Sequence, residues 1–264
     1  MAGEAKTNNF FLGSATVMVG AQADLFNLNP TDHSIGLVKN FTLSAEPSYV
    51  ELTQGVKNTI VDSALTANPV RATMEVYEAT AKNITYGLGL DGSTLATTGN
   101  EYSPNATINA AATTFVIASS DVTTTFAAGT WFMIKEGDDK VHIGKVASSS
   151  FSTDTTVTFT GYAIPTGVSF TTAAKIRKVV EIGVGSKTDQ PYLSAKVVGL
   201  LSNSKPITML FPKLRVVKGF SLAFTTDNYG NLPFEFTPYE QTSSDTNYGK
   251  LLSNGGVVGI YRDI

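Results

Sequence analysis

The sequence predicts a mainly β protein: a β-sandwich or barrel flanked by one α-helix, with a small second β domain inserted into it. Three observations lead to this fold class. Apolar and polar residues alternate along many short segments, which is the period of a strand with one buried face. Val, Thr, Phe and Tyr are plentiful, and turn residues follow at short intervals. The composition also changes abruptly in the middle third of the chain, which indicates an insertion.

The first part of the chain contains the clearest strand, VRATMEVY at residues 70–77. Its alternation predicts that Val70, Ala72, Met74 and Val76 face a core while Arg71, Thr73, Glu75 and Tyr77 face the other way. Similar runs predict strands in GLVKNFTLSA (36–45) and SYVEL (48–52).

One segment predicts a helix, EATAKNITYGLG at residues 78–89. Ala81, Ile84 and Leu88 follow at helical spacing, and Gly87 and Gly89 supply the stop. A single short helix beside a large sheet is expected to cover one of its apolar faces.

The middle third, 91–184, is predicted to be the inserted β domain, and 1–90 together with 185–264 form the larger one. The first half of the insertion has ten threonines and only two charged residues between Ser93 and Thr130. GTWFMIKEGDDKVHIGKV then predicts a hairpin with an acidic turn at Glu136 to Asp139, followed by strands in TVTFTG and KIRKVVEI. Trp131 is expected in the core of this domain.

The last part of the chain predicts strands in YLSAKVVGLL, PITMLFPKLRVV, KGFSLAF and LPFEF. Across the turn TTDNYGN, the last two are expected to bring together Phe220, Leu222 and Phe224 with Leu232, Phe234 and Phe236. Residues 207–211 place apolar side chains on both faces of the strand, so the helix is expected to cover one face and an opposing sheet the other. Pro212 marks an edge or a bend, after which Lys213, Arg215 and Lys218 are expected to reach water or a neighbouring subunit.

Composition excludes several classes of function. The 264 residues carry a formal net charge of only −3, and basic residues are scattered, so the sequence does not indicate a protein that binds nucleic acid by neutralising phosphates. Cysteine is absent, which removes disulfides, thiolate metal sites and cysteine nucleophiles. The sequence also predicts no signal peptide and no membrane span.

Short motifs do not indicate an enzyme. GLGLDG has the spacing GxGxxG, but the predicted helix precedes it instead of following it, and GVGSK lacks the first glycine and the helix of a phosphate-binding loop. The acidic turn is interpreted as a solvated turn, with a calcium site as the alternative. The histidines, His33 and His142, are far apart. We therefore predict no catalytic residue, cofactor or metal site.

The longest polar excursion between strands is TQGVKNTIVDSALTANP, residues 53–69, which still contains several apolar side chains. Apolar residues in a segment that should be exposed indicate a partner surface, with two longer strands and an ordinary turn as the alternative. The contact candidates are Val56, Lys57, Ile60, Val61 and Leu65, with Lys213 and Arg215 from the later strand.

Taken together, this order of strands, excursion, helix, insertion and Phe-rich strands resembles the tail tube (major tail) proteins of tailed bacteriophages. The resembling parts are residues 15–90 and 185–264, about two thirds of the chain. The resemblance implies a tail-tube-type β-sandwich or barrel with one flanking helix, copies forming hexameric rings, and rings stacking into a hollow tube through which DNA is ejected. It also implies that the insertion faces outward.

Further expectations follow from the resemblance. The lumen-lining candidates are Glu51, Thr53, Arg71, Thr73 and Glu75. The partners would be other copies of the chain and the other tail proteins: tape measure, baseplate or tail tip, and tail terminator. DNA would pass through the lumen without specific binding, because a lumen rich in Lys and Arg would retain it. The protein would be located in the virion tail after assembly in the cytoplasm of the bacterial host, without a membrane.

Two alternatives remain open at this point. A tube protein of the type VI secretion kind belongs to the same structural class. A carbohydrate- or receptor-binding β-sandwich, with the Thr-rich region and Trp131 as its binding face, belongs to a different one.

Overall fold

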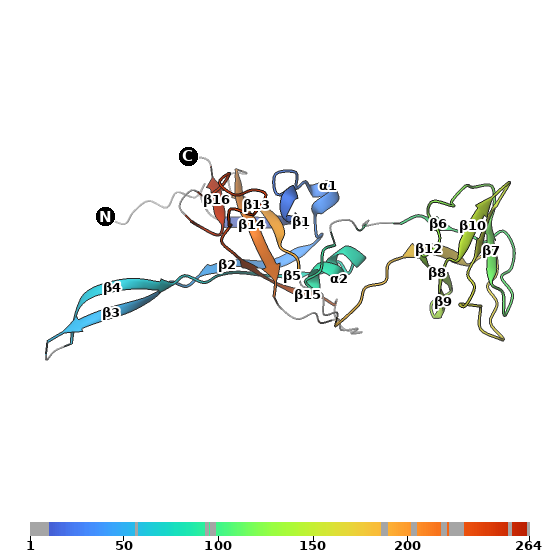
Figure 1. Ribbon diagram of the computed structural model, residues 1–264, viewed down its shortest axis with the longest axis horizontal. Helices are drawn as coiled ribbons and strands as arrows, with labels where there is room; N and C mark the ends of the chain where they lie inside the picture. The colour runs from blue at the N-terminus through green and yellow to red at the C-terminus, as the bar shows by residue number, and fades with distance from the viewer. Residues whose placement is uncertain are drawn as a thin grey trace. The chain divides into compact units, whose positions relative to one another are not determined.

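The computed structural model describes residues 11–55, 58–92, 95, 99–185, 190–201, 205–217, 221, 230–252 and 255–262. The protein is mainly β with several sheets (Figure 1). The chain divides into two compact units. Unit 1 consists of Met1–Thr97 and Val184–Ile264, and unit 2 consists of Thr98–Gly183.

Unit 1 is built on a seven-stranded antiparallel sheet in the order β1-β13-β14-β15-β5-β2, in which β16 also pairs with β14. The strands are β1 (Phe11–Ala21), β2 (Val38–Ala45), β5 (Val70–Val76), β13 (Leu193–Leu201), β14 (Pro206–Val216), β15 (Leu232–Pro238) and β16 (Gly259–Arg262). The predicted strands at 36–45, 70–77, 192–201, 206–217 and 232–236 are thus confirmed. Phe220, Leu222 and Phe224, together with Lys218, lie outside the described residues.

The core of unit 1 lies inside the curl of this one sheet. Buried residues from β1, β5, β13, β14 and β15 form a single apolar cluster, so the same face of five strands must wrap around a common centre. At the edges, Ile35 donates its backbone N–H to the carbonyl of Val17 at 3.1 Å. β1 and β2 do not pair with each other, so the described strands leave the sheet open instead of closing it into a barrel.

The predicted helix is confirmed as α2 (Ala81–Gly87). Thr80 caps its N-terminus by accepting a hydrogen bond from the backbone N–H of Asn83. After it, Gly89 has a φ of +74°, in the left-handed region that glycine enters without strain. Tyr86 is fully buried in the core cluster and donates its hydroxyl to the carbonyl of Val19 at 3.2 Å, so α2 covers the curled sheet.

Two further helical pieces were not predicted: a 3-10 turn at Gln22–Asp24 and the four-residue α1 (Pro30–His33). Within the described ranges, none of the helices is long and apolar enough to cross a bilayer.

The strand β14 differs from the expectation in two ways. Its outer face around Leu210 is covered by the cluster of Met18, Leu25 and Leu28, and not by the helix. The ladder to β13 also gains a residue near Pro212, since Ala195 pairs with Phe211 but Leu193 pairs with Leu214. Pro212 is expected at an edge or a bend; β14 is not an edge strand, and Pro212 lies at a bulge that shifts the alternation of the strand.

Unit 2 packs two antiparallel sheets around a second core. The three-stranded sheet has the order β10-β11-β7 and the four-stranded sheet the order β6-β12-β8-β9. Its strands are β6 (Glu101–Tyr102), β7 (Thr114–Ile117), β8 (Trp131–Glu136), β9 (Lys140–Lys145), β10 (Ser148–Phe151), β11 (Thr155–Thr158) and β12 (Lys175–Val179). Buried residues of both sheets form one cluster rich in edge-to-face phenylalanine pairs.

The predicted hairpin of unit 2 is confirmed as β8 and β9, with the turn at residues 137–139. The expectation that Trp131 lies in the core is wrong. Phe132 and Ile134 are the fully buried residues of β8, so Trp131 and Met133 lie on the opposite face of the strand.

Candidate functional site

The strands β3 (Ser48–Gln54) and β4 (Thr59–Ala67) form a hairpin that continues the ladder of β2 and β5 (Figure 1). Ala45, the last residue of β2, pairs with Val70, the first residue of β5, and Ser48 pairs with Ala67 at the base of the hairpin. We call β3 and β4 the projecting hairpin. The alternative interpretation of this segment, two longer strands joined by a turn, therefore describes the conformation of the single chain.

The turn of the projecting hairpin requires two residues that tolerate positive φ. Gly55 has a φ of +83° and Asn58 a φ of +48°, and the N–H of Asn58 donates to the carbonyl of Gly55 at 3.1 Å. Glycine and asparagine adopt this region most readily. Val56 and Lys57, two of the contact candidates, lie between them and outside the described residues.

Every residue of β3 and β4 is exposed, although the hairpin is rich in large apolar side chains. Six of them are more than half exposed: Tyr49, Val50, Leu52, Ile60, Val61 and Leu65. A two-stranded hairpin in water is marginally stable at best, and strands of this kind normally bury one face. The projecting hairpin is therefore an apolar surface that lacks its cover in the single chain.

The apolar side chains lie on both faces of the projecting hairpin. The ladder pairs Tyr49 with Leu65 and Thr53 with Ile60, which places these residues on one face together with Glu51. Val50 and Leu52 alternate with Tyr49 and Glu51 and so lie on the other face. A partner that covers the hairpin must therefore contact both of its faces.

The outer edges of the projecting hairpin are open, because β3 and β4 pair only with each other in the described sheets. An unpaired edge offers a row of backbone N–H and C=O groups to a further strand. The hairpin can therefore bind a partner through side chains on its faces and through backbone hydrogen bonds at its edges.

A polar surface lies next to the hairpin, on the side of β5 that faces away from the core. Arg71, Thr73 and Glu75 share this side, as predicted from the alternation of the strand. Glu235 lies opposite Thr73 in the ladder of β15 with β5, and Lys39 lies opposite Glu75 in the ladder of β2 with β5. We call these five residues the charge-paired face.

Each charge of this face has an opposite charge beside it. Arg71 pairs with Glu235 at 2.8 Å, and Lys39 faces Glu75. The hydroxyl of Tyr77 donates to Glu75 at 2.9 Å, and this hydrogen bond lowers the pKa of Glu75 below its ordinary value. Two cations and two carboxylates leave the face without net charge, so it offers no surplus cation to a polyanion.

The structure separates the lumen-lining candidates into two groups. Arg71, Thr73 and Glu75 belong to the charge-paired face. Glu51 and Thr53 belong to the hairpin, where they share a face with Tyr49. The sequence did not single out Tyr49, Val50 and Leu52 as contact residues, although the apolar residues at both parities of SYVEL were the available signal.

Lys213 is expected to reach water or a neighbouring subunit, and the structure contradicts its exposure to water. Lys213 is 7% exposed, lies 4.4 Å from the ring centre of Tyr192, and pairs with Asp245 at 2.9 Å. The bulge at Pro212 puts Leu214 and Val216 on the core side of the strand, and the segment after β15 covers Lys213 on the other side. Arg215 is half-buried and stacks on the same ring at 4.2 Å.

Asp245 holds this segment in place. Burial raises its pKa, but hydrogen bonds from Lys213, from the backbone N–H of Thr242 and from Gln22 outweigh burial, so the pKa lies well below its ordinary value. The Lys213–Asp245 pair is therefore a structural ion pair inside unit 1.

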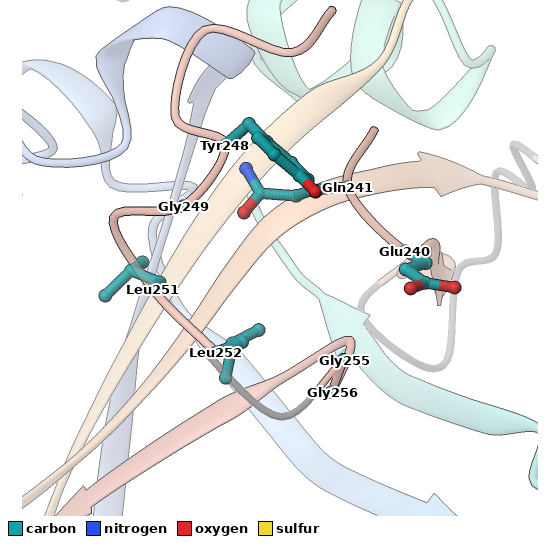
Figure 2. Close-up of a pocket in the computed structure, with 8 residues that line it drawn as sticks. All are labelled: Glu240, Gln241, Tyr248, Gly249, Leu251, Leu252, Gly255 and Gly256. Atoms are coloured by element: carbon teal, nitrogen blue, oxygen red, sulfur yellow. The ribbon is translucent and has the colours of Figure 1, made fainter. Parts of the chain in front are cut away.

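The same segment borders a cavity of about 200 Å³ in unit 1 (Figure 2). Glu240, Gln241, Tyr248, Leu251 and Leu252 line it, from the chain between β15 and β16. Its lining holds one carboxylate, on Glu240, one phenol, on Tyr248, and no histidine. Among the described residues, no group of three His, Cys, Asp or Glu side chains could hold a metal ion.

Comparisons with known proteins do not place the chain in a family. No protein-family model matches the chain, and no curated protein matches it.

Proposed function

We propose that the protein is a structural subunit that assembles with copies of itself into the hollow tail tube of a tailed bacteriophage, and that it is not an enzyme. The observation that carries this proposal is the projecting hairpin, with large apolar side chains exposed on both of its faces. The proposed fold is accordingly the tail-tube type, completed between subunits.

The energetic case rests on what the hairpin gains when it is covered. Fully burying one large apolar side chain contributes roughly 1.5–3 kcal/mol. Six side chains that are each about half exposed would therefore contribute on the order of 5–10 kcal/mol per hairpin. A gain of this size favours a stable assembly over a transient contact, because association must also offset lost freedom of motion.

The geometry of the hairpin favours an assembly with many members. A hairpin on one subunit that inserts between other subunits contacts a different surface from its own, so the interface is heterologous. Such interfaces close into rings when the rotation permits and otherwise continue as filaments. The number of six copies per ring comes from the resemblance to tail tube proteins.

The charge-paired face is proposed to line the bore. DNA slides past a surface most freely when that surface releases no counterions from it, and this face has its cations already paired. The proposed partners are other copies of the chain, tape measure, tail tip or baseplate, and terminator proteins. The proposed location is the virion tail, and a type VI secretion tube is the close alternative within this class.

Electron microscopy of the purified protein tests the proposal. Wild-type protein is expected to form hollow tubes at high concentration. A variant in which Tyr49 to Leu65 is replaced by a two-residue Asn-Gly turn should stay folded and monomeric, because the removed residues are outside the core cluster. Tubes formed equally well by this variant would refute the role of the hairpin.

A further inference from the structure

We propose that unit 2 binds an acidic polysaccharide on the outward face of its four-stranded sheet, through Lys135 and Lys175 with Arg177 beside them. This inference concerns a different surface from the projecting hairpin and does not depend on tube formation. We call this surface the cationic face.

The cationic face follows from the ladders of β12 with β8 and of β8 with β9. Lys175 pairs with Lys135, Arg177 with Met133, and Trp131 with Lys145. These six residues alternate with the buried Phe132, Ile134 and Ile176, so they lie on the side of the sheet that faces away from the core.

The charges of this face are poorly balanced. Lys135 and Lys175 stand directly opposite each other, and like charges in that position destabilise a sheet. Glu101 is the carboxylate beside these cations. It pairs with Arg177 and, at 3.6 Å, with Lys175. No carboxylate pairs with Lys135 in the part of the chain that the structure describes.

The cationic face borders a cavity of about 270 Å³, lined by Lys135, Lys175, Arg177, Glu101, Met133 and Glu136. Glu136 is already held by Lys140 and by the hydroxyl of Thr171. Three cations and one shared carboxylate therefore remain, which leaves a surplus of positive charge for an anionic group.

The surplus is local and does not reflect the composition of the unit. Residues 98–183 hold six Lys and Arg against seven Asp and Glu, so unit 2 is slightly acidic as a whole. Four of the six cations lie on the cationic face, while Asp121, Asp138, Asp139 and Asp154 lie in turns and loops.

A second cation position lies farther along the same face. Lys145 lies 5.4 Å from the ring centre of Trp131. The indole is held by an edge-to-face contact with Tyr162 and by a hydrogen bond from its N–H to Glu181 at 2.9 Å. Lys135 follows Trp131 by four positions in β8, which is roughly 13 Å along a strand. Two cation positions at this spacing suit a polymer with repeated anionic groups.

Apolar side chains between the cations favour a saccharide over DNA. Val141 and Ile143 are 45% and 54% exposed, and their ladder partners Lys135 and Met133 place them on the cationic face. A DNA backbone presents phosphates and little apolar surface, and its affinity depends on many cations. An acidic polysaccharide presents carboxylate or phosphate groups together with the apolar faces of its sugar rings, which matches this mixture.

Binding of the full-length protein to immobilised polymers, measured by biolayer interferometry, tests this inference. The probes are polygalacturonate, which carries carboxylates on its sugar rings, phosphorylated dextran, which carries phosphates on its sugar rings, neutral dextran, and a duplex DNA. The wild-type protein is expected to bind at least one of the first two more tightly than dextran and DNA, and the stronger of these identifies the anionic group.

The variant K135Q/K175Q is expected to lose roughly tenfold or more in affinity, the order expected from removing charged hydrogen-bond donors. The matched control K178Q removes a cation from the other side of the same strand and should bind within about twofold of wild type. K135Q should also keep or raise the melting temperature, since it relieves the opposed lysines.

Three results would overturn the inference: no binding to either acidic polymer, an equal loss in K178Q, or tighter binding to duplex DNA.

Discussion

Replacing Ile60 and Leu65 of the projecting hairpin by serine is expected to weaken assembly without unfolding the subunit. The two side chains are 53% and 55% exposed in the single chain, so covering them in the assembly would contribute roughly 1–1.5 kcal/mol each. Their combined loss of about 2–3 kcal/mol corresponds to a rise of roughly 30- to 150-fold in the subunit concentration at which assembly begins.

Sedimentation of the protein over a range of subunit concentrations measures this threshold. The matched control is I143S in unit 2, because Ile143 is 54% exposed but lies outside the hairpin. The control should assemble at the wild-type concentration, and circular dichroism should show that both variants remain folded. A threshold that is unchanged in I60S/L65S, or raised equally in I143S, would show that covering the projecting hairpin does not drive assembly.

The remaining predictions concern the charge-paired face and the two cores. E75Q/E235Q leaves two cations on the charge-paired face without their carboxylates and should raise the affinity for duplex DNA, measured by gel shift; unchanged affinity would contradict the role given to charge pairing. D245A leaves a buried lysine unpaired and should cost about 3–5 kcal/mol in urea denaturation. Because the folded pKa of Asp245 lies below its ordinary value of 3.8, its contribution is complete above about pH 4 and is lost as pH falls further, so the stability of D245A should fall less steeply in acid. G144A should lower the melting temperature, since its Cβ would lie 2.6 Å from the buried ring of Phe132; an unchanged value would mean that the ring can shift freely.

Local patterns predicted the parts of the fold that depend on neighbours in sequence. The alternation of β5, the start and stop of α2, and the turn between β8 and β9 all follow from side-chain period and turn chemistry within a dozen residues. The position of the projecting hairpin could be predicted for the same reason, because consecutive apolar residues, which fall on both faces of a strand, occur close to the turn residues Gly55 and Asn58.

Features that depend on distant partners were missed. Lys213 stands where the apolar–polar alternation of the strand predicts a surface residue. The bulge at Pro212 and the pairing with Asp245, 32 residues later, give no signal in the neighbouring sequence. Trp131 was assigned to the core because aromatic residues bury readily, but its neighbour Phe132 occupies the inward position. The two-residue period of a strand decides which neighbour faces the core, and composition does not.

The charge balance of the candidate site was likewise invisible in the sequence. The partners of the predicted lumen residues are Glu235, which lies 164 residues from Arg71, and Lys39, which comes from a different strand of the sheet. A sequence with scattered charges and a net charge near zero is compatible with neutral, acidic or basic faces. The ladders of the sheet determine which charges meet.

A cryo-EM reconstruction of the assembled protein would show whether the projecting hairpin and the charge-paired face have the proposed positions in a hollow tube. The expected map shows stacked rings around an open bore, with the projecting hairpins buried between neighbouring subunits and Arg71, Thr73 and Glu75 facing the bore. A filament with a filled centre, or an assembly in which the hairpins remain exposed to solvent, would contradict it.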